Sequence, residues 1–190
     1  MNTLLFKPIA KFQENRLLIF GIIIAALSVF VAVQTGTRFD GAIDAHTGND
    51  VSIVIAVKDF VIAIVTMVAF LFIAAKLINS KTRFIDILNT VLIARMTILF
   101  AAIISALPYL KNISEQIVAA EGDQMEVARL AMNPLFIGLS ILLVLLLVWH
   151  IALLWNGFKI SSNAKGGKAV ALFVVAIICA EVTSKLLLTI

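Results

Sequence analysis

Six charged or titratable side chains lie within or beside long apolar stretches of this sequence. Such groups are costly at membrane depth and are often found on ion, proton or substrate pathways. Carboxylates and an imidazole at these positions could bind cations or transfer protons. The candidates for an intramembrane polar site are Asp59, Asp86, Arg95, His150, Glu181 and Lys185.

Glu181 is the candidate expected to lie deepest in a membrane. If its helix begins near Ala169, Glu181 lies about 18 Å along that helix, close to the middle of a bilayer. Lys185 follows four residues later, the spacing at which glutamate and lysine pair on one helix face. Two interpretations stay open: a locally neutralised structural pair, or a functional acid facing a polar cavity that opens outward.

Arg95 and His150 are expected nearer the opposite side. Arg95 lies about 9 Å inside the apolar core, so its guanidinium could extend back to the headgroups. His150 lies between Trp149 and Trp155 in a position typical of an interfacial aromatic belt. We expect a snorkelling arginine and an interfacial, hydrogen-bonding histidine, with a pathway residue and a proton relay as the alternatives. An enzyme would need Asp86 to converge with both near lipid phosphates, and the sequence gives no sign of this.

The segment after the first apolar stretch contains a candidate metal site. Asp40, Asp44 and His46 lie within seven positions, and Asp59 follows. Carboxylate oxygens and an imidazole nitrogen can ligate a divalent cation, although a solvated acidic loop gives the same pattern. We expect no other cofactor and no enzyme, because nucleotide-binding, serine-hydrolase and zinc-protease motifs are absent and Cys179 is the only cysteine.

The composition places these residues in a membrane protein. The 190 residues are 62% hydrophobic and 14% charged, with a mean hydropathy of +1.11. Soluble domains are about 45–50% apolar and about 25% charged. This excludes an ordinary water-soluble domain, a disordered chain and a disulfide scaffold. We therefore expect contact with a lipid bilayer and no nucleic-acid partner.

Five apolar stretches are long enough to cross a bilayer, which requires about 20 residues for a helix. Their continuous apolar character favours helices over the alternating strands of a barrel. The predicted fold is therefore all-α: a single membrane domain of five transmembrane helices after an amphipathic leader at 1–16. The predicted helices cover about 17–33, 57–77, 84–110, 135–155 and 169–190, and residues 51–57 could extend the second.

The distribution of charge predicts the orientation. Lysine and arginine dominate residues 1–16, 76–83 and 159–168, whereas acidic residues dominate 38–59 and 111–129. By the positive-inside rule, the N-terminus and the basic connections face the cytoplasm and the C-terminus faces outside. We take the first stretch as a retained helix rather than a cleaved signal peptide, because a poor cleavage site follows it.

Three segments resemble the Yip family, five-helix membrane proteins named for interaction with Ypt/Rab GTPases, which also have bacterial relatives. The segments are F-K-P-I-A-K-F (6–12), F-D-G-A-I-D-A-H (39–46) and K-T-R-F-I-D-I-L-N-T-V-L-I-A-R (81–95). The resemblance implies a cytoplasmic N-terminus and supplies no catalytic residues. The long N-terminal region of eukaryotic members is absent, so we expect a bacterial-type member in the cytoplasmic (inner) membrane and no Rab-type interaction.

Two functions are compatible with these patterns. The preferred one is a non-enzymatic Yip-family membrane protein that organises membrane or binds lipid and protein partners. The alternative is a small transporter or channel for protons, ions or a divalent metal, with Glu181 as its central carboxylate. Small residues such as Gly21, Ala25 and Ala102 could pack helices within one chain or between copies. A homo-oligomer and a membrane-protein partner therefore both stay open.

Overall fold

A computed structural model of the chain describes residues 6–47, 51–120 and 122–189. Within them, five helices are long and apolar enough to cross a membrane, which confirms the predicted all-α polytopic bundle. The spanning helices are α3 (Glu14–Thr35), α4 (Ile53–Ile78), α5 (Phe84–Ser105), α8 (Pro134–Ser162) and α9 (Gly166–Thr189).

Shorter elements connect the spanning helices. The leader contains α2 (Pro8–Lys11), and its first five residues lie outside the described part of the chain. A minimal antiparallel hairpin, β1 (Thr37–Arg38) with β2 (His46–Thr47), follows α3. Two helices, α6 (Pro108–Ala119) and α7 (Gln124–Ala131), separate α5 from α8.

The third spanning helix is shorter than the predicted 84–110. It ends at Ser105 because Pro108 begins a separate helix, α6. Proline is favoured in a first helical turn and holds the preceding residue in an extended conformation, as Leu107 has with ψ 133°. Asp123 then caps α7 by accepting hydrogen bonds from two backbone N–H groups at 3.1 and 3.2 Å. The acidic connection at 111–129 therefore contains two helices.

The other four spans are longer than their predicted ranges, and α3 covers Glu14–Thr35 instead of about 17–33. α4 begins at Ile53 because the side chain of Ser52 accepts a hydrogen bond from a first-turn N–H. α8 extends past residue 155 to Ser162 and ends where Asn163 adopts a left-handed φ of 52°. α9 begins at 166 instead of 169, directly after the short turn that follows α8.

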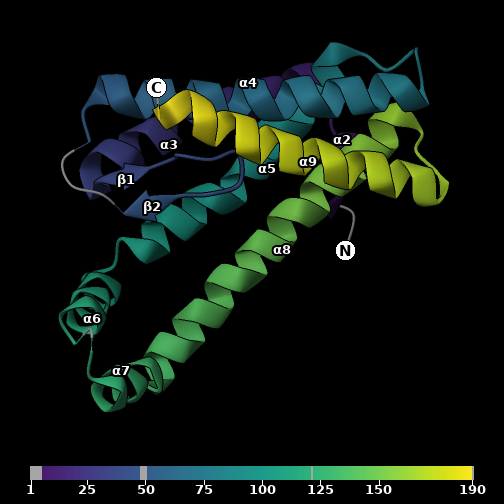
Figure 1. The fold of residues 1–190 in the computed structure, drawn as a ribbon. Helices are drawn as coiled ribbons and strands as arrows, with labels where there is room; N and C mark the ends of the chain where they lie inside the picture. The colour runs from purple at the N-terminus through teal and green to yellow at the C-terminus, as the bar shows by residue number, and fades with distance from the viewer. Residues whose placement is uncertain (1–5, 48–50, 121, 190) are drawn as a thin grey trace.

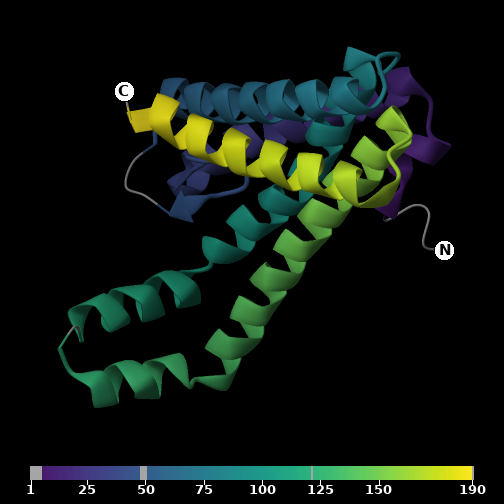
Figure 2. The ribbon, with the colours of Figure 1, turned by 45° about the vertical axis from the view of Figure 1, so that its right-hand side comes forward.

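α5 is the central helix of the bundle. It packs against α3, α8 and α4, and α4 packs along α9; Figure 1 shows the latter two side by side. In the middle of α5 the consecutive apolar residues Val91, Leu92, Ile93 and Ala94 are all buried, so this part of the helix is enclosed on every side. The two chain ends lie at opposite ends of the bundle (Figure 2). We call the end with β1, β2 and the C-terminus the hairpin end, and the other the leader end.

One part of the chain projects from the bundle. Residues 106–148, which include α6, α7 and the first half of α8, diverge from α3, α4 and α9 toward the hairpin end (Figures 1 and 2). We call this segment the arm. Within the arm, the Tyr109 hydroxyl donates to Asn133 Oδ1 at 2.7 Å and joins α6 to the start of α8. At its base, Lys111 Nζ donates to the carbonyl of Thr35 in α3 at 2.9 Å.

Candidate functional site

The hairpin end brings together several candidate residues predicted from the sequence, because the loop between β1 and β2 folds onto α9. The N–H of Ala42 donates to Ser184 Oγ at 2.9 Å, and the N–H of Ile43 donates to Glu181 Oε2 at 2.9 Å. Gly41 permits this approach, since a Cβ there would lie 2.5 Å from Glu181 Oε1. Glu181 thus binds the loop backbone directly.

Glu181 also forms the predicted pair with Lys185. Lys185 Nζ lies 3.1 Å from Glu181 Oε1, and the i, i+4 pairing expected from the sequence is confirmed. The same ammonium lies 2.9 Å from Asp44 Oδ2. Two carboxylates therefore share one cation, and the pair is part of the contact between loop and helix.

The candidate metal ligands also lie together. His46 Nδ1 is 2.8 Å from Asp40 Oδ1, and His46 Nε2 is 3.8 Å from Asp44 Oδ2. One potential ligand atom from each lies within 4.8 Å of the others. A divalent cation fits this donor set chemically, but it would compete with Lys185 for Asp44 and with the contact between Asp40 and His46. Metal binding stays a prediction.

The same contacts shift the pKa values of His46 and Asp44. The hydrogen bond with Asp40 raises the pKa of His46 above its ordinary 6.5, against an opposing effect of partial burial. Burial disfavours ionised Asp44, but the hydrogen bond from Lys185 and the charges of His46 and Lys185 outweigh burial and lower the pKa of that carboxyl. The loop therefore favours a protonated imidazole beside ionised carboxylates.

Asp59 is held by a partner that sequence reasoning missed. Its side chain has no solvent exposure, and its two oxygens accept hydrogen bonds from Arg38 Nε at 2.8 Å and Nη2 at 3.0 Å. Fork-shaped pairing of this kind is among the stronger polar contacts in proteins. The hydrogen bond to Asp59 raises the pKa of Arg38. Asp59 is therefore bound to β1.

Arg95 does not snorkel. It is 1% exposed, because α5 is enclosed by other helices and gives the side chain no path to a headgroup. Its guanidinium carbon lies 5.9 Å from the ring centroid of Phe60, a cation–π distance. Among the described residues, neither Nη atom has a hydrogen-bond partner. The expectation of an interfacial arginine was wrong.

His150 forms hydrogen bonds as expected, but it is not interfacial. It is 1% exposed, with Nδ1 2.9 Å from the Ala94 carbonyl and 3.0 Å from Thr97 Oγ1. Its Nε2 has no partner within the described ranges. The prediction was wrong because α8 continues to Ser162, which places His150 about 18 Å from the helix end. His150 therefore joins α8 to α5.

Asp86 lies apart from Arg95 and His150. Arg83 Nη2 is 2.6 Å from Asp86 Oδ1 and 2.8 Å from Glu14 Oε2. The pKa of Arg83 is raised by its hydrogen bond with Asp86. Asp86 therefore helps to fix the leader end of the bundle, and the three-residue convergence that an enzyme would require is not formed.

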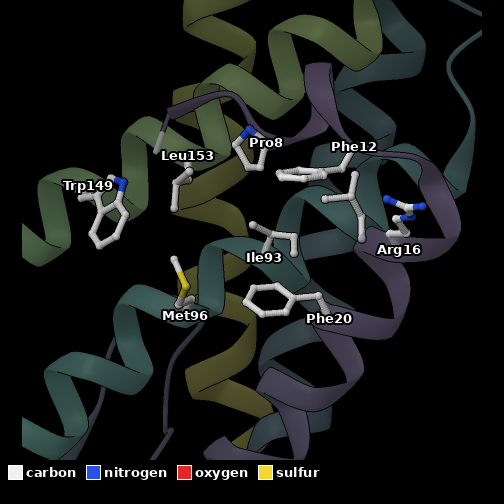
Figure 3. Close-up of a pocket in the computed structure, with 9 residues that line it drawn as sticks. Pro8, Phe12, Arg16, Phe20, Ile93, Met96, Trp149 and Leu153 are labelled. Atoms are coloured by element: carbon white, nitrogen blue, oxygen red, sulfur yellow. The ribbon is translucent and has the colours of Figure 1, made fainter. Parts of the chain in front are cut away.

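A cavity at the leader end had no counterpart in the sequence analysis. It has a volume of about 390 Å³ and lies between the leader, α3, α5 and α8. Figure 3 shows the side chains around it, including Phe12, Phe20, Met96 and Trp149. The signal available in the sequence was the amphipathic character of the leader.

Comparison with known proteins gives one match. The Yip1 domain family matches residues 5–182. No curated protein matches the chain, and no solved structure matches it. The matched range contains both the loop and Glu181, and it ends before Ser184 and Lys185.

Proposed function

The chain belongs to the Yip1 domain family, and we propose that it is a non-enzymatic membrane protein that organises the surrounding membrane through contacts with lipid and membrane proteins. We further propose a bacterial cytoplasmic membrane as its location, with the leader end inside. The concentration of lysine and arginine at that end supports this orientation.

The arm is the observation that carries this proposal. The first half of α8 presents large apolar side chains on several faces, with Ile141, Leu142 and Leu147 exposed by 56, 41 and 38%. Within a bilayer such surface must be covered by lipid tails or by another membrane protein. A helix that leaves its bundle in this way supports a role in contact with the membrane.

The position of the arm suggests how such contact could act. The arm widens the molecule at the hairpin end only (Figures 1 and 2). A body of this shape displaces more lipid from one leaflet than from the other, so an array of such molecules favours a curved membrane. The proposed mechanism is therefore mechanical.

The use of the acidic side chains is consistent with a structural role. Asp59 is held by Arg38, Glu181 holds the N–H of Ile43, and Asp86 is held by Arg83. The first two carboxylates each join one element to another, and Arg83 links Asp86 to Glu14 of α3. These contacts support an assignment in which the charged residues shape the bundle.

Reconstitution tests the proposal. Vesicle diameter should fall as the ratio of protein to lipid rises, measured by electron cryomicroscopy. Asn133→Ala removes both the acceptor for Tyr109 and the N-cap of α8, so it should weaken the effect while circular dichroism still reports a folded bundle. A matched control, Asn163→Gly, changes an amide at the other end of α8 and should leave the effect intact.

The same vesicles test the transport alternative. An unchanged diameter at every protein density would contradict the proposal. Proton or divalent-metal flux that Glu181→Gln abolishes would replace it with a transporter. A second copy that covers the arm would appear as a defined oligomer in detergent, and the organising unit would then be that oligomer.

A further inference from the structure

The cavity at the leader end has the properties of a ligand site. Its volume of about 390 Å³ lies within the roughly 300–1,000 Å³ typical of small-molecule pockets. Its lining is predominantly apolar, with Phe12, Phe20 and Met96 among the lining residues and Trp149 on one side (Figure 3). Arg16 is the charged residue in that lining. An apolar volume with one cation at its edge suits an amphipathic anion.

Specific contacts fix the leader over this cavity. Gly157 of α8 lets the leader approach, since a Cβ there would lie 2.7 Å from Ile9 Cδ1. Asn89 Nδ2 donates to the Glu14 carbonyl at 3.2 Å, where the leader meets α3. The cavity is therefore formed by the fold before any ligand enters.

Arg16 differs from the other exposed arginines. Arg38, Arg83 and Arg129 each lie within 2.8 Å of a carboxylate oxygen. Glu14, the nearest acid along the chain, is engaged by Arg83. Among the residues that the structure describes, the guanidinium of Arg16 has no hydrogen-bond or ion-pair partner. With respect to the described residues, its five donors are free for an external phosphate, a group whose geometry the guanidinium fork matches.

The floor of the cavity continues along α5. Ile93 and Met96 line the cavity, and Phe100 and Ile103 follow at helical spacing with exposures of 42 and 45%. These four residues cover about 15 Å of one helix face. They form an apolar path from the leader end toward the middle of the membrane.

We propose that this cavity binds one acyl chain of an anionic glycerophospholipid, with the headgroup phosphate at Arg16. The inference deepens the proposed function and rests on it, because the ligand comes from the surrounding bilayer. A zwitterionic lipid is disfavoured because its own cation would lie near Arg16. The acyl chain follows the path over Phe100 and Ile103.

Trp149 provides a direct test. The chain has two tryptophans, and Trp155 packs against the rings of Phe158 and Phe173. Trp155→Phe keeps an aromatic ring there and leaves Trp149 as the single reporter. In phosphatidylcholine vesicles, acyl-brominated phosphatidylglycerol should quench Trp149 fluorescence at a several-fold lower mole fraction than acyl-brominated phosphatidylcholine.

Variants of the cation separate a specific site from general lipid contact. Arg16→Gln should abolish the difference between the two lipids, and Arg16→Lys should restore most of it. Lys11→Gln removes an exposed leader cation outside the cavity lining and serves as the matched control. Equal quenching by the two lipids in the parent protein, or a preference that survives Arg16→Gln, would overturn the proposal.

Two further outcomes keep the tests distinct. If neither brominated lipid quenches Trp149 and the protein is a dimer, the cavity is covered by a second copy. That result would overturn the lipid site. Arg16→Gln should leave the effect on vesicle diameter unchanged, because the arm lies toward the other end. Failure of the lipid site and failure of the organising function therefore give different results.

Discussion

Gly41 lies directly against the carboxylate of Glu181, so that a Cβ at position 41 would be 2.5 Å from Oε1 and 2.8 Å from the Cβ of Asp44. The contact brings a loop from the first third of the chain onto its last helix. It also explains why Glu181 can accept the N–H of Ile43. Glu181 thus anchors the backbone of the β1–β2 loop to α9.

Replacing Glu181 tests that assignment. Glu181→Ala leaves the N–H of Ile43 without its acceptor and should cost about 1–3 kcal/mol of stability. Glu181→Gln retains a side-chain oxygen and should cost clearly less. Thermal unfolding in detergent measures both. Equal losses would show that charge, rather than the hydrogen bond to Ile43, is what matters.

The pair of Arg38 and Asp59 should show strong coupling. Arg38→Met leaves the fully buried carboxylate of Asp59 without a cation and should lower the free energy of unfolding by about 3 kcal/mol. This value is at the low end for a broken buried pair because Arg38 itself is 41% exposed. Adding Asp59→Leu should recover most of that loss. A double-mutant cycle by chemical denaturation measures the coupling, and additive losses would contradict it.

Two glycines of α8 provide a matched comparison. A Cβ at Gly157 would meet Thr90 Oγ1 at 2.5 Å and Ile9 Cδ1 at 2.7 Å, whereas Gly138 has nothing within 4 Å. Gly157→Ala should therefore destabilise by about 1–3 kcal/mol through overpacking. Gly138→Ala should be neutral or slightly stabilising, since alanine favours a helix. Melting temperatures in detergent compare them, and similar effects would argue against tight packing at Gly157.

The loop should respond to pH through His46. Because Asp40 raises the pKa of folded His46 above 6.5, its contribution is fully present below pH 6.5 and is lost as pH rises through the higher folded value. Asp44 acts in the opposite sense: its pKa is lowered, so its contribution is lost only in acid. The amide-exchange rate of residues 39–46, corrected for the intrinsic chemical rate, should therefore rise from pH 6 to pH 8.

The matched variant for this prediction is His46→Asn. It should exchange faster at pH 6 and lose the pH dependence beyond the intrinsic chemical rate. An unchanged profile would mean that Lys185 and Glu181 hold the loop without the imidazole.

Helix length and spacing explain what the sequence could predict. Continuous apolar stretches defined five spans, and the four-residue separation of Glu181 and Lys185 predicted their pairing. The start of α6 was also readable in Pro108, as was that of α7 in Asp123, because proline and N-cap residues mark helix starts. The apolar run that continues past Pro108 to Leu110 obscures the first of these signals.

The remaining contacts depend on which helix lies in the centre. A membrane helix that is apolar on all sides gives no periodic signal for its buried face, so the burial of Arg95 and His150 could not be derived. The pairing of Arg38 with Asp59 spans 21 residues and requires the β1–β2 turn. The cavity needs four separate elements and has no local signature.

The long-range contacts of the hairpin end also set an order for biosynthesis. The N–H of Ala42 and its acceptor Ser184 are 142 residues apart, so one is made well before the other. At about 5–20 residues per second, the early loop remains without its partner for on the order of ten seconds during translation. A chain that stops before α9 would keep that unpaired backbone and an uncovered face of α4. Synthesis of α9 is therefore the step that completes the contacts of this loop.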